Sequence, residues 1–125
     1  MSAGTFLVTI LAGGLGAVVR FVVDGLIMRR ITPGFPWGTF AINATGSLLL
    51  GFLTGLADSS LLDASLLFIL GGGFCGGYTT FSTAMVDTMN LIQKGQYRGA
   101  LLNGGGLLLL CVSVAAIGLA LGRSL

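Results

Sequence analysis

A run of glycines followed by two adjacent threonines interrupts the third apolar stretch of the sequence. Residues 71–83 read GGGFCGGYTTFST, and the apolar residues 64–74 favour a membrane helix. A helix that breaks inside the bilayer leaves backbone carbonyls and amides without partners, and each costs several kcal/mol in hydrocarbon. Such a break is tolerated where protein buries it, where it lines water or where it holds an ion. We therefore expect a functional site here, with an ion as its ligand.

Two charged residues lie inside the first apolar stretch. Arg20 and Asp24 are four positions apart, which places them on one helix face near the end of the stretch. An intramembrane charge suggests function, but near the interface an arginine can also reach water and pair with an acid. Arg20 is therefore either an attractor of anions in a vestibule or an interfacial residue. We expect Asp24 to be its partner or a surface residue.

The second apolar stretch contains one amide side chain. Asn43 follows Trp37, a residue suited to the membrane interface, by six positions. An amide in lipid must find a partner, so Asn43 faces either a neighbouring helix or a polar path. By spacing alone, a hydrogen bond between helices is the better interpretation.

Composition shows which elements position these residues. The chain has 125 residues, of which 54% are hydrophobic and 8% charged, and its mean hydropathy is +1.01. One domain of this size cannot hide so much apolar surface from water, so lipid is the expected solvent, with about 20 apolar residues per span. We predict an all-α membrane protein, a single domain over residues 1–125. Its expected transmembrane helices are residues 4–28, 39–57, 64–93 with its break, and 99–122.

The composition also excludes several functions. The chain contains no histidine and no glutamate, which removes the commonest metal ligand and the usual proton-coupling carboxylate. Its net charge of +2 is too small to indicate nucleic acid. The glycine run resembles a phosphate-binding loop but lacks the lysine, and it lies in an apolar stretch, so we expect no enzymatic activity. Cys75 and Cys111 are expected to be small buried residues and not a disulfide.

Glycine and charge together suggest how the helices assemble and insert. Gly51 and Gly55 have the spacing of a close-packed helix face, but four thin helices can hardly enclose a pore, so we expect an oligomer. Four basic residues lie in the first and third connections and one lies on the opposite side. The positive-inside rule then places both chain ends outside the cytoplasm. The four are Arg29, Arg30, Lys94 and Arg98, and the one is Arg123.

Three segments together resemble the fluoride-specific ion channel family, called Fluc or CrcB. They are GGLGAVVRF (13–21), PWGTFAINATGSLLLG (36–51) and GFCGGYTTFST (73–83), and the four-span layout and the KGQY loop agree. The resemblance implies a passive fluoride-selective channel that exports fluoride across the inner or plasma membrane and relieves its toxicity. It also implies a dimer of two inverted subunits, with the third helix broken and two narrow pores.

The resemblance assigns roles to individual residues. Gly76 and Thr79 match positions whose backbone carbonyls hold a structural sodium ion. Asn43 matches the pore asparagine, which reverses its interpretation as a contact between helices, and Phe81 matches the first of two pore phenylalanines. Ser82 and Thr83 can donate hydroxyls to the ion, Asn103 belongs to a polar track on the fourth helix, and Arg20 serves the vestibule.

Three features depart from the family pattern. Ala84 stands where the second pore phenylalanine is expected. The fourth-helix track is polar only at its first position, and the basic residues are strongly biased to one side. We therefore favour a homologous subunit of opposite orientation as the partner over a second copy of this chain. The track is Asn103, Leu107, Cys111 and Ala115.

Two alternatives stay open at this point. The chain could be a non-conducting or partly degenerate structural subunit of a heterodimeric channel. A small multidrug transporter has the same size and also forms inverted dimers, but it needs a membrane-embedded carboxylate, usually glutamate. Asp24 lies near a helix end beside Arg20, so this alternative is the weaker one.

Overall fold

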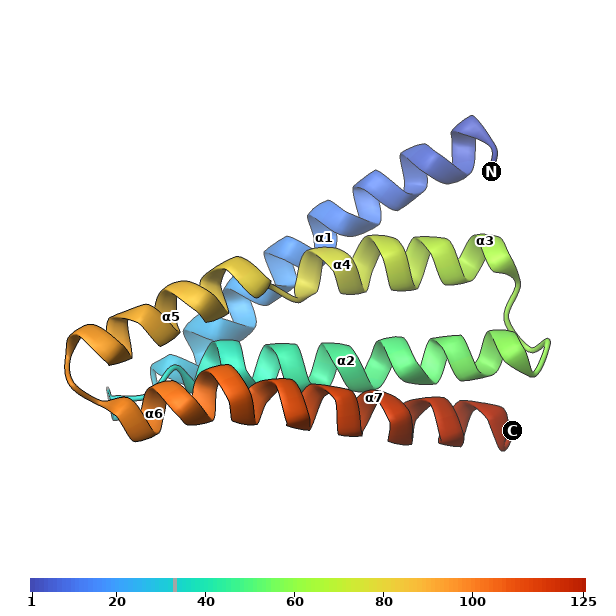
Figure 1. Ribbon diagram of the computed structural model, residues 1–125. Coiled ribbons are helices and arrows are strands. Elements are labelled where there is room, and N and C mark those ends of the chain that lie inside the picture. The colour runs from blue at the N-terminus through green and yellow to red at the C-terminus, as the bar shows by residue number, and fades with distance from the viewer. Residues whose placement is uncertain (33) are drawn as a thin grey trace.

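The chain folds into two pairs of long helices in the computed structural model, which describes residues 1–32 and 34–125 (Figure 1). Pro33, in the first predicted connection, lies outside the described residues. The first and second spans are α1 (Ala3–Met28) and α2 (Trp37–Asp58). The third span comprises α3 (Ala64–Leu67), η1 (Phe68–Cys75), α4 (Gly76–Tyr78) and α5 (Phe81–Gln93). The fourth comprises α6 (Tyr97–Leu101), η2 (Leu102–Gly106) and α7 (Leu107–Arg123).

Local chemistry explains where several helices begin. Ser2 accepts a hydrogen bond from the Thr5 amide at the start of α1, at 3.0 Å. Asp63 accepts one from the Leu66 amide at the start of α3, at 2.7 Å. Each side chain satisfies an amide that the first helical turn leaves without a partner. The segments η1 and η2 are π-helical turns within the glycine-rich parts of the third and fourth spans.

Glycines bring α2 and α7 into backbone contact. The two helices run in the same direction (Figure 1), and a Cβ added at Gly51 would overlap the backbone of Ala115. A Cβ at Gly118 would likewise overlap the backbone around Leu48 and Phe52. Small residues let membrane helices approach this closely, and the prediction of a packing face at Gly51 is confirmed.

A second close approach joins α1 to the first half of the third span. A Cβ at Gly77 would overlap the backbone of Gly13, and one at Gly16 would overlap that of Phe74 and Tyr78. A Cβ at Gly73 would meet the backbone oxygen of Thr9 on α1. Gly73 and Gly77 thus allow the close contact with α1, and both remain helical. The two helix pairs meet around a small buried core that includes Ile42, Leu53 and Cys75.

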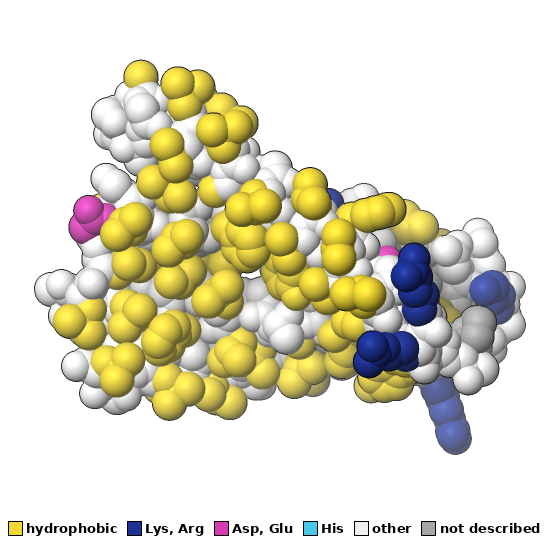
Figure 2. Space-filling model, turned by 180° about the vertical axis from the view of Figure 1, so that it is seen from behind, with side chains coloured by type: hydrophobic (Ala, Val, Ile, Leu, Met, Phe, Trp, Pro, Cys, Tyr) yellow, Lys and Arg dark blue, Asp and Glu magenta, His cyan; other side chains and the backbone are white. Residues whose placement is uncertain are grey.

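The outer surface of the protein is apolar over most of its length. Figure 2 shows hydrophobic side chains covering the middle of the molecule, with Lys and Arg gathered toward one end. All four spans are long and apolar enough to cross a bilayer. The protein is therefore a multi-pass membrane protein. Among its exposed apolar side chains are Leu7, Leu11, Phe21, Leu101 and Leu109.

The end of the molecule opposite the basic cluster has its own polar contacts. Arg123 forms an ion pair with Asp58, with 2.6 Å between Nη2 and Oδ2. The Ser59 hydroxyl donates to the carbonyl of Arg123 at 3.2 Å. The C-terminal end of α7 is thereby joined to the turn that follows α2, and the single basic residue on this side is paired with an acid.

Candidate functional site

The third span is interrupted by two extended threonines. Helix α4 ends at Tyr78, and Thr79 (φ −82°, ψ 161°) and Thr80 (φ −150°, ψ 124°) are extended before α5 begins. The prediction of an interruption within residues 71–83 is confirmed. The glycines, which suggested it, are not where the chain departs from helix. The break occupies the two threonines alone.

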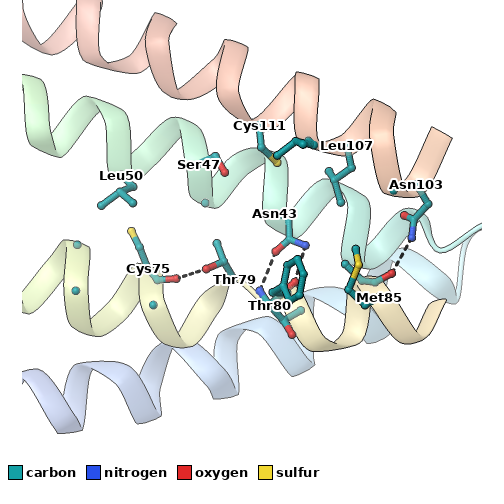
Figure 3. A pocket seen from close by; sticks show the side chains of 18 residues that line it. Asn43, Ser47, Leu50, Cys75, Thr79, Thr80, Met85, Asn103, Leu107 and Cys111 are labelled. Atoms are coloured by element: carbon teal, nitrogen blue, oxygen red, sulfur yellow. Dashed lines mark hydrogen bonds between the residues drawn. The ribbon is translucent and has the colours of Figure 1, made fainter. Parts of the chain in front are cut away.

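Asn43 on α2 bonds to the backbone of the break. Its Nδ2 donates to the carbonyl oxygen of Thr80 at 2.8 Å, and the Thr80 amide donates to its Oδ1 at 2.8 Å. Asn43 is buried, and Figure 3 shows it pointing from α2 toward the break. The hydrogen bond between spans expected from spacing alone is present. One N–H of the Asn43 amide remains for another acceptor.

Several backbone carbonyls at the break lack a hydrogen-bond donor among the described residues, and those of Gly76 and Thr79 are among them. Within the described ranges 1–32 and 34–125, neither the carbonyl oxygen of Gly76 nor that of Thr79 accepts a hydrogen bond. The neighbouring Cys75 oxygen, by contrast, accepts from both the amide and the hydroxyl of Thr79, at 2.9 and 2.8 Å. Free carbonyl oxygens are the ligands that hard cations prefer. The described residues contain no cluster of acidic, histidine and cysteine side chains that could bind a metal instead.

A groove of about 580 Å³ runs along the break, between α2, the third span and the fourth span. Most of its lining is apolar or glycine, and its polar side chains are Asn43, Ser47, Thr79, Thr80 and Asn103 (Figure 3). Three of the four fourth-helix track residues line it, namely Asn103, Leu107 and Cys111. Ala115 instead packs against Gly51 on α2.

The start of α5 carries the other residues predicted for the pore. Phe81 lines the groove and is 79% exposed. Ser82 and Thr83 are also exposed. The Thr83 hydroxyl accepts from the Thr80 hydroxyl at 3.2 Å, so its own hydrogen is free to donate. These side chains lie at the surface of the described part of the chain, where its own residues leave them open.

Asn103 is the most deeply buried polar side chain of the groove, with 0% exposure. Its Nδ2 donates to the Ala84 carbonyl at 3.1 Å and to the Thr88 hydroxyl at 2.9 Å. Its Oδ1 is buried and has no hydrogen-bond partner among the described residues. Both amide hydrogens are therefore engaged by α5, and Asn103 presents an acceptor.

Arg20 lies at a second cavity, of about 320 Å³, on the other side of the break. Asp24, Thr80 and Thr83 line this cavity as well. Of the two interpretations of Asp24, partner of Arg20 or surface residue, the ion pair does not form among the described residues. Where the chain is described, Arg20 Nε is buried without a partner, and the Asp24 carboxylate lies against Gly38 on α2. The reason is local: the side-chain-free Gly38 lets Asp24 turn toward α2.

Comparison with known proteins identifies the family. Residues 7–119 match the protein family described as CrcB-like protein, Camphor Resistance (CrcB). The chain belongs to the CrcB family. The match covers all four spans, and so the resemblance seen in three sequence segments extends over the fold that positions the site.

Curated relatives of this CrcB chain are named as channels. "Fluoride-specific ion channel FluC 1" of Leifsonia xyli is 52% identical over 90% of this chain and 82% of the relative. A protein of the same name from Rubrobacter xylanophilus is 43% identical over 88% and 86% of the two chains. "Fluoride-specific ion channel FluC 2" of Cutibacterium acnes is 46% identical over 94% and 97%.

Sequence reasoning did not single out Thr80 as a residue of this CrcB site. Thr80 binds Asn43 through its backbone, and its hydroxyl caps α5 by accepting from the Thr83 amide at 3.2 Å. A sequence signal for this role exists, because threonine immediately before an expected helix start is typical of an N-cap residue. The two adjacent threonines indicate an interruption, but they do not show which of them caps the following helix.

Proposed function

We propose that this chain forms a passive fluoride-selective channel that lets fluoride leave the cytoplasm. The observation that carries the proposal is that relatives 43–52% identical over most of the chain are named fluoride-specific ion channels. Hydrogen fluoride crosses membranes as a neutral weak acid and dissociates in the more alkaline cytoplasm, which traps the anion. A selective channel releases it down its electrochemical gradient without ATP or a coupling ion.

The side chains at the break suit a small, strongly hydrated anion. Such an ion must exchange water for hydrogen-bond donors, and the free N–H of Asn43 and the hydroxyls of Ser82 and Thr83 can supply them. The positive edge of the Phe81 ring can face the anion as well. Asn103 completes the path differently, because its unpartnered Oδ1 can hold a water molecule that hydrates the ion.

Arg20 attracts the anion to the pore entrance in this proposal. Its buried Nε lacks a partner among the described residues, and its cavity reaches Thr80 and Thr83 at the break. A cation in a cavity with low-dielectric walls raises the local concentration of anions. Asp24 does not pair with it, so no acidic side chain among the described residues neutralises this charge.

A structural sodium ion is part of the proposed site. The carbonyl oxygens of Gly76 and Thr79 would hold it, which fits their lack of hydrogen-bond donors in the described part of the chain. The bound cation would be the positive partner that these two carbonyl oxygens otherwise lack. It stays in place and is not transported.

The functional unit is proposed to be a dimer of inverted subunits. Phe81 is 79% exposed and the groove beside it is open, so a partner is needed to enclose an ion path. The basic bias predicts one orientation for this chain, which favours a homologous subunit of opposite orientation as the partner. A second copy of this chain is the other candidate.

The competing functions have less support. A purely structural subunit would explain the apolar groove residues Leu107 and Cys111, but the curated relatives are named as channels. The same names disfavour a small multidrug transporter and an enzyme. The groove retains the exposed ring of Phe81, which packing within the chain does not explain.

Fluoride efflux from liposomes tests the proposal. Vesicles loaded with fluoride contain the purified chain, alone or with a homologous subunit, and a fluoride electrode follows release while chloride release serves as the control. Fast release of fluoride without chloride is the expected result. Equal release of both anions, or no release from folded protein under either condition, would overturn it.

A further inference from the structure

Asn43 and Thr80 are joined by two reciprocal hydrogen bonds. Nδ2 of Asn43 donates to the Thr80 carbonyl, and the Thr80 amide donates to Oδ1, each at 2.8 Å. A backbone carbonyl can only accept and a backbone N–H can only donate, so this pairing fixes the orientation of the side-chain amide. Figure 3 shows both bonds between α2 and the break.

This pairing requires an extended Thr80. In an extended residue the N–H and C=O point to the same side, as they do in a hydrogen-bonded pair of antiparallel strands. In a helix they point toward opposite ends of the axis. With φ −150° and ψ 124°, Thr80 has the extended geometry. Asn43 therefore bonds only to the broken form of the third span.

The same bond keeps one carbonyl free. In an unbroken helix the Thr80 amide would donate to Gly76, four residues earlier. Here that amide donates to Asn43 Oδ1 instead, and the Gly76 oxygen accepts no hydrogen bond from the described residues. Asn43 thus diverts the one donor that an unbroken helix would give to Gly76.

The Thr80 side chain keeps the Thr79 carbonyl without a hydrogen-bond donor in the same way. An unbroken helix would pair the Thr83 amide with the Thr79 oxygen. That amide donates instead to the Thr80 hydroxyl at 3.2 Å. The peptide between Thr79 and Thr80 is trans, so with its N–H facing Asn43 its C=O points away from Asn43. For the Gly76 and Thr79 carbonyls, therefore, Asn43 and the Thr80 hydroxyl capture the amides that an unbroken helix would supply.

We propose that the Asn43 amide and the Thr80 hydroxyl are positioning residues for the sodium site. Resting on the proposed function, this inference gives Asn43 a second task beyond donating to fluoride. By capturing the amides of Thr80 and Thr83, the two groups keep the Gly76 and Thr79 carbonyls unpaired and hold the break extended. Removal of either group lets the third span return toward a continuous helix, and cation affinity falls.

The test measures sodium affinity apart from fluoride flux. The purified full-length assembly is heated in detergent over a sodium series, with choline keeping ionic strength constant, and the sodium concentration for half-maximal stabilisation is recorded. We expect Thr80→Val and Asn43→Leu each to raise this midpoint at least about tenfold. Thr80→Ser, which keeps a capping hydroxyl, should restore the wild-type midpoint.

Thr54→Val is the matched control for Thr80→Val, since it makes the same exchange at a hydroxyl that donates to Leu50 of its own helix. Its sodium midpoint should equal that of the wild type. Unchanged midpoints in both Thr80→Val and Asn43→Leu would overturn the positioning role. If Asn43→Leu does not fold, the Thr80→Val and Thr80→Ser pair still decides, because neither alters Asn43.

A second readout separates this proposal from the sodium site itself. The Cα chemical shift of ¹³C-labelled Thr80 distinguishes extended from helical backbone whether or not sodium is bound. We expect an extended shift in the wild type and a helical shift in Asn43→Leu. A wild type that sodium does not stabilise would contradict the proposed ion. An extended Thr80 shift retained in Asn43→Leu would contradict the positioning role.

Discussion

The Nδ2 atom of Asn103, in η2, donates to the backbone oxygen of Ala84, in α5, at 3.1 Å. The same nitrogen donates to the Thr88 hydroxyl, one turn further along α5, at 2.9 Å. Asn103 thereby joins the second half of the third span to the fourth span. Ala84 itself is 2% exposed, so the small residue at this position allows the contact.

Substitution of Asn103 should separate its volume from its hydrogen bonds. Asn103→Leu keeps the branched shape of the side chain and loses both bonds, and Ala84 still accepts from Thr88. The free energy of unfolding should therefore fall by about 1 kcal/mol. Asn103→Asp turns a carboxylate toward the Ala84 carbonyl and should destabilise more. Thermal unfolding in detergent measures both. An aspartate variant as stable as the leucine variant would contradict the donor role of the amide.

Two glycines on α1 offer a matched test of helix packing. A Cβ at Gly16 would overlap the backbone of Phe74 and Tyr78, whereas one at Gly14 has nothing within 4 Å. Gly16→Ala should therefore lower the free energy of unfolding by roughly 1–3 kcal/mol. Gly14→Ala should be neutral or stabilise by up to about 1 kcal/mol, because alanine favours helix. Equal effects in thermal unfolding would show that α1 does not pack closely here.

The helices and the interruption were predictable because lipid leaves few alternatives for an apolar chain. Long uncharged stretches can cross a bilayer only as helices or closed barrels, and polar connections separate the stretches. The location of the break was less predictable. Glycines weaken a helix in sequence terms, yet Gly73 and Gly77 stay helical because they contact the backbone of α1. Packing against α1 therefore determines where the break lies, and the spacing of residues in the sequence does not reveal that packing.

The sequence indicates which types of residue belong to the site, but it does not indicate which hydrogen bonds and ion pairs they form. Asn43 was placed between two interpretations, and its hydrogen bonds to Thr80 depend on backbone angles that no motif specifies. Arg20 and Asp24 have the correct spacing for a pair, but Asp24 turns toward Gly38 on another helix. Side-chain choices of this kind follow from the neighbouring span.

Phe81 should affect ion flux with little effect on folding. Its ring is 79% exposed, so Phe81→Ile removes little packing within the chain but takes away the ring edge proposed to face fluoride. We expect fluoride efflux to slow at least about tenfold, equivalent to roughly 1.4 kcal/mol on the barrier. Phe6→Ile, at an exposed position near the start of α1, is the control. An unchanged rate would leave Phe81 with a packing role only.

Asn43→Asp should abolish fluoride flux. A fixed negative charge beside the path repels the anion, and an oxygen in place of Nδ2 faces the Thr80 carbonyl, which has no hydrogen to give. Liposome efflux should fall to the level of empty vesicles, while size-exclusion chromatography should show an intact assembly. Normal flux through the aspartate variant would remove Asn43 from the ion path.

The distribution of charge should give this chain a single orientation. Arg29, Arg30 and Lys94 lie in the first and third connections and Arg98 lies in the first turn of α6, whereas Arg123 on the opposite side is paired with Asp58. Arginine and lysine near the ends of spans are retained on the cytoplasmic side, so a C-terminal reporter should lie outside the cytoplasm. Arg29→Gln combined with Arg30→Gln should produce a mixture of orientations, and Arg123→Gln should not. Labelling of a C-terminal cysteine from each side measures the fraction in each orientation. Equal labelling of the wild type from both sides would favour a dimer of two copies of this chain over a partner of opposite orientation.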